Sequence, residues 1–281
     1  MALTENVEIT APMEINANVT IDLAGKTISV SAPMVNNGTM NIAGGTITNT
    51  SATVIENNGV MALSNGAKIV AKQADGITTK AGGTLTIEAG ATIESNGAPV
   101  RALGGEVTIN GGTFKQTGTA VGSVSTYRYA VDCRENGKIT VNGGDFTSGN
   151  GVINVNAGAE VIINGGKFTN NVEKSMTRHL AYVGGSLIIK DGEFYGVANS
   201  AAGGCFFCIA DPAASIAIEG GKFTSLWSSG AANKIVESYY GGSTWTLSIT
   251  GGLFNTDKGI ANYVEANTDA ATMAAYPYKA K

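Results

Sequence analysis

Short segments of alternating apolar and polar residues, each followed by a glycine-containing turn, recur along most of this chain. Val107 and Ile109 fall on one face of a predicted strand and Thr108 on the other, because successive side chains in a strand point to opposite faces. The Asn-Gly-Gly that follows predicts a turn, since Gly adopts positive φ without steric cost and Asn tolerates it well. Phe114 then resumes the inward-facing series. The segment recurs at residues 107–114, 139–146, 161–168, 187–194, 216–223 and 247–254.

Weaker copies extend this repeat toward the N-terminus, with Ile in place of Phe at residues 40–47 and 85–93. A second segment rich in Asn and Gly precedes the copies, as at residues 35–38 and 55–59. Two or three short strands per repeat, recurring every few tens of residues, are typical of a solenoid. The central aliphatic residues are then expected to stack as one internal ladder: Ile21, Ile42, Leu63, Ile87, Ile109, Val141, Ile163, Ile189, Ile218 and Ile249.

This pattern resembles the right-handed, pectate-lyase-like parallel β-helices of phage tailspikes and fibres, polysaccharide lyases and surface proteins of gut bacteria. The resemblance covers roughly residues 7–254 and implies an architecture rather than one family. We therefore predict an all-β protein, a parallel β-helix (β-solenoid) of about ten coils over residues 1–258, with residues 1–18 as an N-terminal cap or first coil. Residues 259–281 are predicted to be a C-terminal cap or anchoring tail, with a short helical turn within 268–275.

Composition agrees with this architecture and excludes some partners. The 39 Gly and 5 Pro suit coils that need many special turns and strands that keep their N–H donors. The net charge of −4 leaves no basic stripe for a phosphate backbone, so we expect no binding to nucleic acid. No stretch approaches the roughly 18 apolar residues that a membrane span requires.

The cysteines predict neither a disulfide framework nor a metal site. Cys133, Cys205 and Cys208 cannot all pair, and in a strand Cys205 and Cys208 would point to opposite faces. We therefore expect no redox pair at C-F-F-C. The single histidine, His179, lies far from them in sequence and a fourth ligand is not evident, so no zinc site is predicted. We expect no cofactor.

Charged residues are scattered, which argues against a catalytic cluster. Asp132 and Arg134 form the tightest mixed-charge group and are expected on one side of a strand, opposite Cys133. Charges also recur at one turn position, and stacking of opposite charges about 4.8 Å apart explains them better than catalysis does. We therefore assign no catalytic residue and expect that the protein is not an enzyme. The charges at this position are Asp145, Lys167, Asp191, Glu193 and Lys222.

The coils lengthen in the C-terminal half. The spacing between equivalent turn glycines is 22 residues from Gly90 to Gly112 but 32 from Gly112 to Gly144. The extra residues are expected to leave the body as loops at one corner, at residues 115–128, 169–179, 195–204 and 224–233. Aromatic residues on or near these loops form a candidate binding surface for a sugar or a protein. They are Tyr127, Tyr129, Tyr195, Trp227, Tyr239, Tyr240 and Trp245.

Three classes of function fit these features. The first is a non-enzymatic bacteriophage virion component (head fibre, capsid decoration or tail fibre) that presents a carbohydrate- or receptor-binding face. The resemblance to phage fibres implies a homotrimer, attached through one end to a capsid or other virion protein. The first residues have no basic or apolar signal-peptide region, which favours a virion location. The alternatives are a bacterial surface adhesin or carbohydrate-binding β-helix whose leader was removed, and a polysaccharide lyase or glycoside hydrolase.

Overall fold

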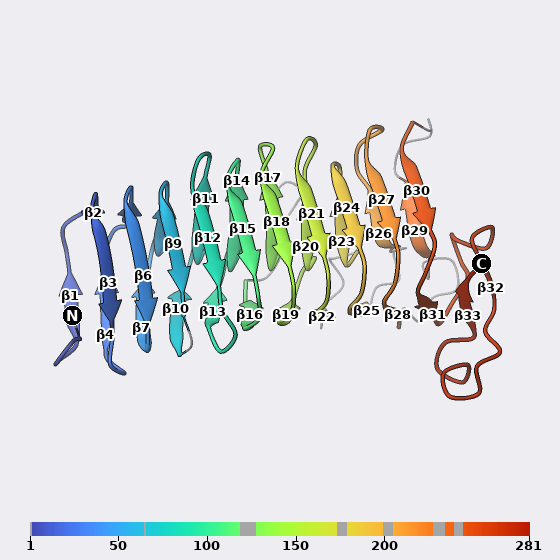
Figure 1. Ribbon diagram of the computed structural model, residues 1–281, viewed down its shortest axis with the longest axis horizontal. Helices are drawn as coiled ribbons and strands as arrows, with labels where there is room; N and C mark the ends of the chain where they lie inside the picture. Colours follow the sequence, from blue (N-terminus) through green and yellow to red (C-terminus); the bar gives the residue numbers. More distant parts are fainter. Residues whose placement is uncertain are drawn as a thin grey trace.

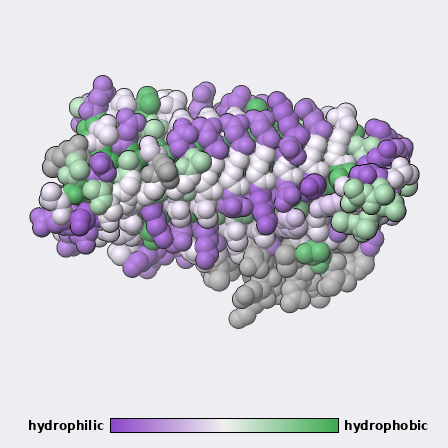
Figure 2. Space-filling view, turned by 60° about the horizontal axis from the view of Figure 1, so that its bottom comes forward, coloured by the Kyte–Doolittle hydropathy of each residue, from purple (hydrophilic) through white to green (hydrophobic). Residues whose placement is uncertain are grey.

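The chain winds into a rod whose coils stack along the long axis, with the two termini at opposite ends (Figure 1). The computed structural model describes residues 2–64, 66–118, 128–172, 179–198, 205–226, 234–238 and 244–281. Equivalent strands of successive coils pair in parallel, which gives three long sheets within these ranges. The structure thus confirms the predicted parallel β-helix. Figure 2 shows a face covered mostly by hydrophilic and weakly polar residues, with hydrophobic residues in separate patches.

The described residues contribute the following strands to the three sheets. The first sheet has 13 strands: β1 (Val7–Ile9), β4 (Thr27–Val30), β7 (Gly45–Asn49), β10 (Ala67–Ala71), β13 (Thr92–Ser95), β16 (Thr113–Gln116), β19 (Asp145–Ser148), β22 (Lys167–Val172), β25 (Glu193–Ala198), β28 (Lys222–Ser225), β31 (Leu253–Phe254), β33 (Tyr278–Ala280) and β32 (Val264–Ala266). The second sheet has ten: β2 (Met13–Ile15), β5 (Met34–Asn36), β8 (Ile55–Asn57), β11 (Ile77–Lys80), β14 (Val100–Leu103), β17 (Val131–Arg134), β20 (Ile153–Val155), β23 (Ala181–Val183), β26 (Cys205–Ile209) and β29 (Lys234–Ser238). The third sheet also has ten: β3 (Asn18–Asp22), β6 (Thr39–Ala43), β9 (Val60–Leu63), β12 (Thr84–Ile87), β15 (Glu106–Ile109), β18 (Lys138–Val141), β21 (Glu160–Ile163), β24 (Ser186–Ile189), β27 (Ser215–Ile218) and β30 (Thr246–Ile249).

The predicted aliphatic ladder runs along the inner face of the third sheet. Its ten members pair in register from Ile21 in β3 to Ile249 in β30, and all from Ile42 onward are buried. The first sheet carries a matching column of Phe rings on its inner face. Neighbouring rings from Phe114 to Phe254 are nearly parallel, with centroids 4.5 to 4.9 Å apart. These two buried columns make up most of the core that the sequence pattern predicts.

The turn glycines have the backbone conformation that the pattern requires. Gly112 and Gly144 have φ of 112° and 115°, and a Cβ at Gly112 would lie 2.7 Å from the carbonyl oxygen of Ala91. Positive φ and this close approach both favour glycine.

The second sheet carries a short column of buried amides on its inner side, which the sequence pattern does not predict. The Nδ2 of Asn36 donates to Oδ1 of Asn57 at 2.7 Å, and Nδ2 of Asn57 donates to the carbonyl of Thr84 at 2.9 Å.

The two ends of the rod differ. The first coil consists of β1, β2 and β3, and inward residues such as Val7 and Val19 remain half-exposed. At the other end, β33 pairs antiparallel with both β31 and β32, and Ile260 and Val264 are buried. Residues 270–275 form hydrogen-bonded turns without a regular helix. The N–H groups of Met273 and Tyr276 bond to the carbonyls of Asp269 and Thr272, four residues earlier, which is the spacing of the predicted helical turn. The Asp269 side chain accepts from the Ala271 N–H and the Thr272 hydroxyl at the start of this turn.

Candidate functional site

The long connections of the C-terminal coils all join the same two sheets. The long connections from β16 to β17, β22 to β23, β25 to β26 and β28 to β29 each lead from the first sheet to the second. Most of each predicted loop lies outside the described residues. The parts outside are residues 119–127, 173–178, 199–204 and 227–233. The strands on either side nevertheless confirm that all four connections share one corner of the rod. A binding site is therefore expected on the rod faces beside this corner.

The structure describes three of the seven aromatic residues of the predicted binding surface. Tyr129 is buried, with 2% of its surface exposed, so it is not part of an exposed aromatic surface. Trp245 is half-buried and packs against the core just before β30. Tyr195 is half-exposed on the outer side of β25, and it is the member of the set around which polar groups gather. The remaining four lie outside the described residues: Tyr127, Trp227, Tyr239 and Tyr240.

Tyr195 belongs to a regular polar surface on the outer side of β19, β22, β25 and β28, which we call the Tyr195 face. One residue of each strand forms a charged column, and the residue two positions later forms a second column of hydroxyl-bearing side chains. The charged column is Asp145, Lys167, Glu193 and Lys222, and the hydroxyl column is Thr147, Thr169, Tyr195 and Thr224. In-register pairing of parallel strands places these side chains side by side along the rod.

Contacts within the Tyr195 face connect the two columns. Lys222 Nζ lies 3.6 Å from Glu193 Oε1, and the Tyr195 hydroxyl donates to Glu193 Oε2 at 3.5 Å. Lys167 Nζ lies 5.4 Å from the centroid of the Tyr195 ring, which is cation–π distance. Partial burial, followed by the negative charge of Glu193, raises the pKa of Tyr195. The phenol therefore stays protonated at neutral pH and donates to Glu193 Oε2.

The tail adds one side chain to this surface. Thr224 Oγ1 donates to the hydroxyl of Tyr276 at 3.3 Å. Tyr276 also lies close enough to Tyr195 to contribute to the raised pKa of its phenol. Three hydroxyl groups, from β25, β28 and the segment before β33, thus meet on one part of the surface. The sequence pattern did not predict Tyr276 as a site residue, because it lies beyond the last repeat.

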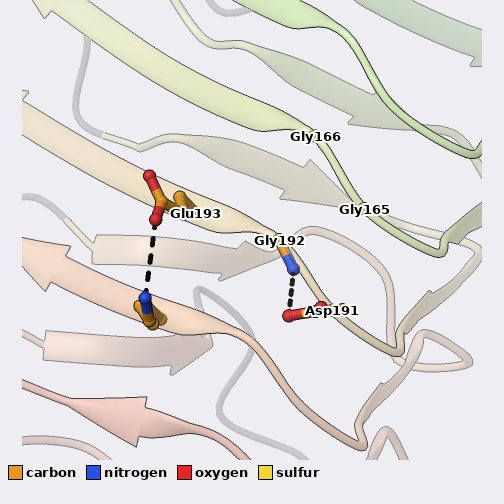
Figure 3. A pocket seen from close by; sticks show the side chains of 6 residues that line it. Gly165, Gly166, Asp191, Gly192 and Glu193 are labelled. Carbon is orange, nitrogen blue, oxygen red and sulfur yellow. Dashed lines mark hydrogen bonds and ion pairs between the residues drawn. The ribbon is translucent and has the colours of Figure 1, made fainter. Parts of the chain in front are cut away.

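A pocket of about 330 Å³ opens at the turn that leads into these strands. Asp191 lies beside Gly192 (Figure 3). Its Oδ1 accepts the Gly192 N–H at 2.8 Å, and Glu193 forms an ion pair with Lys222 of the next strand. The pocket is shallow and polar, and it is continuous with the Tyr195 face through Glu193 and Lys222. Its walls are formed by Gly165, Gly166, Asp191, Gly192, Glu193 and Lys222.

The predicted stacking of opposite charges is present in the Tyr195 face. The environment of Asp132 is different. Asp132 and Arg134 do share the outer side of β17 while Cys133 points inward. However, Asp132 is fully buried. Its Oδ2 accepts from Arg101 Nε at 2.8 Å, and its Oδ1 accepts from Arg134 Nε at 2.7 Å and from Asn154 Nδ2 at 2.7 Å. Both carboxylate oxygens are therefore occupied by donors from three adjacent coils.

A second carboxylate completes this buried cluster. Asp75 forms an ion pair with Arg101, and its Oδ1 accepts the backbone N–H of Ala98 at 2.7 Å. Burial raises the pKa of Asp75, and the nearby positive charge of Arg101 offsets this only in part. Beneath the cluster, burial raises the pKa of the Cys133 thiol to about 12, so this cysteine is not a reactive thiolate. The cluster joins four coils, and we interpret its role as stabilising the stack of coils.

A buried contact between Tyr129 and His179 links two coils that are separated by a third. The Tyr129 hydroxyl and His179 Nε2 lie 3.1 Å apart, and the Tyr129 ring passes over Gly151 of the intervening coil. A Cβ at Gly151 would overlap the Tyr129 ring.

Gly151→Ala should therefore displace Tyr129 and lower the free energy of unfolding by about 1–3 kcal/mol, measured by urea denaturation. Gly149→Ala is the matched control, because a Cβ there meets no atom within 4 Å. Equal stability of the two variants would contradict the assigned packing.

The prediction that Cys205 and Cys208 point to opposite faces is wrong. Their Cα atoms are 5.6 Å apart and a disulfide joins them. The consecutive residues Phe206 and Phe207 are both buried, as are Ile235 and Val236 at the equivalent position of the next coil. The chain therefore bends at this corner, and strand alternation does not apply across the bend.

Replacing both Cys205 and Cys208 by Ser should lower the free energy of unfolding by about 2 kcal/mol, because the closed loop is short. Alkylation of the denatured protein with and without reductant, followed by mass spectrometry, measures the pairing directly. Complete alkylation of three thiols without reductant would contradict the disulfide.

Neither a family model, nor a curated protein, nor a solved structure matches this chain. Within the described ranges, no three His, Cys, Asp or Glu side chains are grouped so that they could hold a metal ion. In the same ranges, no helix is long and apolar enough to cross a membrane.

Proposed function

We propose that this protein is a non-enzymatic scaffold that binds a carbohydrate through the Tyr195 face. The observation that carries the proposal is the half-exposed Tyr195 ring, held between Lys167, Glu193 and Tyr276 on a rigid sheet beside a polar pocket. An aromatic ring offers an apolar surface to the C–H side of a sugar, and the surrounding hydroxyl, carboxylate and ammonium groups match its hydroxyls.

The rigidity of the scaffold supports a binding role. Each strand of the Tyr195 face is hydrogen-bonded on both sides, and the Phe stack lies directly beneath it. Side chains on such a support lose little conformational freedom when a ligand binds. A site of this kind is already formed before binding, so modest contacts are enough to give measurable affinity.

The pairing of Asp132 and Glu193 supports binding rather than catalysis. Hydrolysis of glycosides generally uses two carboxyl groups that flank the reacting bond. Asp132 has no free carboxylate oxygen for a substrate, because Arg101, Arg134 and Asn154 donate hydrogen bonds to both of its oxygens. Glu193 is shared between Lys222 and Tyr195. These acids thus stabilise and shape the scaffold.

The biological setting that we propose is a phage fibre or capsid decoration, with a bacterial surface protein as the alternative. The rod shape and the polar faces fit both. Light scattering of the purified protein, before and after heating in SDS, tests the proposed homotrimer. A trimer that resists SDS supports the fibre, and a monomer contradicts it.

Tyr195→Ala should weaken binding to the best glycan of a polysaccharide panel by about tenfold or more, which corresponds to ~1.4 kcal/mol. Tyr195→Phe should retain most of the affinity, because the ring is kept and only the hydroxyl is lost. Thr108→Ala, on the outer side of the third sheet, is the control and should bind as the wild type does. Unchanged binding by Tyr195→Ala would overturn the proposed function.

A further inference from the structure

The charges of the Tyr195 face balance within the face itself. Lys167 is in register with Asp145 on one side and Glu193 on the other, and Glu193 is in turn paired with Lys222. Two acids and two lysines thus alternate along one column. A polyanion gains affinity from an unbalanced array of basic side chains, and a polycation from an unbalanced array of acidic ones. The alternating column favours neither.

The polar groups of the face repeat along the rod and not across it. Neighbouring strands lie about 4.8 Å apart, so the column through Thr147, Thr169, Tyr195 and Thr224 presents a hydroxyl at each coil. Across the rod, β28 offers only Lys222 and Thr224 on its outer side before the strand ends. An extended ligand therefore meets most groups when it lies along the column. One sugar of an extended polysaccharide is similar in length to this spacing.

Two features give this column a defined centre. The Tyr195 ring replaces a small Thr in the hydroxyl column, so it is the one aromatic side chain of that column. The hydroxyl of Tyr276 reaches the same place from the tail and contacts Thr224. A chain lying on the column would thus stack one sugar on Tyr195 and place its neighbours against Thr169 and Thr224.

We infer that the Tyr195 face takes an uncharged, extended polysaccharide whose chain runs parallel to the rod axis, with about one sugar per coil. This inference rests on the proposed function and deepens it by naming the ligand class and its direction. Recognition then comes from stacking and hydrogen bonding, and ion pairing with the ligand contributes little.

Calorimetric titration of the intact protein with oligosaccharides from dimer to hexamer tests the inference. The neutral probes are cello- and chito-oligosaccharides, and the acidic probes are oligogalacturonates. For a neutral series, affinity should rise with each added sugar up to about four, the coils that form the face, and then level off. Raising the salt from about 0.05 M to about 0.5 M should change the dissociation constant less than about twofold.

The outcomes separate the inference from the proposed function. If an acidic series binds more tightly than the neutral ones, depends on Tyr195 and weakens more than about tenfold at high salt, the inference fails while the proposed function stands. Affinity that is already maximal for a disaccharide overturns the parallel arrangement and again leaves the proposed function intact. If no oligosaccharide shows binding that depends on Tyr195, both fail.

Discussion

Phe168→Ala is expected to lower the free energy of unfolding by about 3–5 kcal/mol. Phe168 is fully buried in the middle of the Phe column, with ring centroids 4.7 Å from Phe146 and 4.9 Å from Phe194. Removing the ring opens a cavity that both neighbours line, and the paired strands on either side hold them apart. The structure can therefore relax only in part, and most of the packing energy is lost.

The change is measured by urea denaturation, with the midpoint and the slope compared between variants. Phe168→Leu is the conservative control and should cost less, since it keeps much of the buried volume. Phe254→Ala should also cost less, because Phe254 is the last described ring of the column and stacks on Phe223 alone. A loss below about 1 kcal/mol for Phe168→Ala would mean that the column does not support the core.

Asp132→Ala is expected to destabilise the protein by a similar amount, about 3–5 kcal/mol. The variant leaves Arg101 and Arg134, which are both largely shielded from water, without their shared carboxylate. It also removes one of the two acceptors of Asn154 Nδ2, which keeps Asn156 Oδ1 at 3.0 Å. The cost comes mainly from Arg134, whose ion-pair partner is lost, and from Arg101, which keeps only Asp75.

Asp145→Ala is the matched control, because Asp145 is an exposed acid in the same repeat and its loss should change stability by less than about 1 kcal/mol. Asp132→Asn keeps the shape and one acceptor oxygen, so it should lie between the two. If Asp132→Ala and Asp145→Ala unfold at the same urea concentration, Asp132 is as solvated as Asp145, and the assignment of a buried cluster is wrong.

The inner half of the fold was predictable because each repeat specifies its own inward face. A Val or Ile two positions before another aliphatic residue, followed by Asn-Gly-Gly and Phe, determines both the strand and the turn locally. The Ile column ending at Ile249 and the Phe column ending at Phe254 follow from that alone. Neither requires knowledge of the distance between repeats.

The outer half was less predictable, because its contacts depend on register between coils of different length. Arg101 pairs with Asp132 across 31 residues, and the insertion between them hides this register. Aligning the second repeated segment would have placed Arg101, Asp132 and Asn154 in one column and so revealed the cluster. Tyr276 lies beyond the repeat, and the bend at Phe206 cancels the alternation on which the cysteine prediction depended.

Fluorine NMR of protein labelled with fluorotyrosine tests the central claim, that the Tyr195 face binds the ligand, most directly. The chain has nine Tyr residues, and the resonance that disappears in Tyr195→Phe identifies Tyr195. We predict that titration with the tightest-binding neutral oligosaccharide shifts the Tyr195 resonance, while the resonances of Tyr263 and Tyr278 stay in place. A Tyr195 resonance that does not move while another tyrosine responds would contradict the account and place the binding surface elsewhere on the rod.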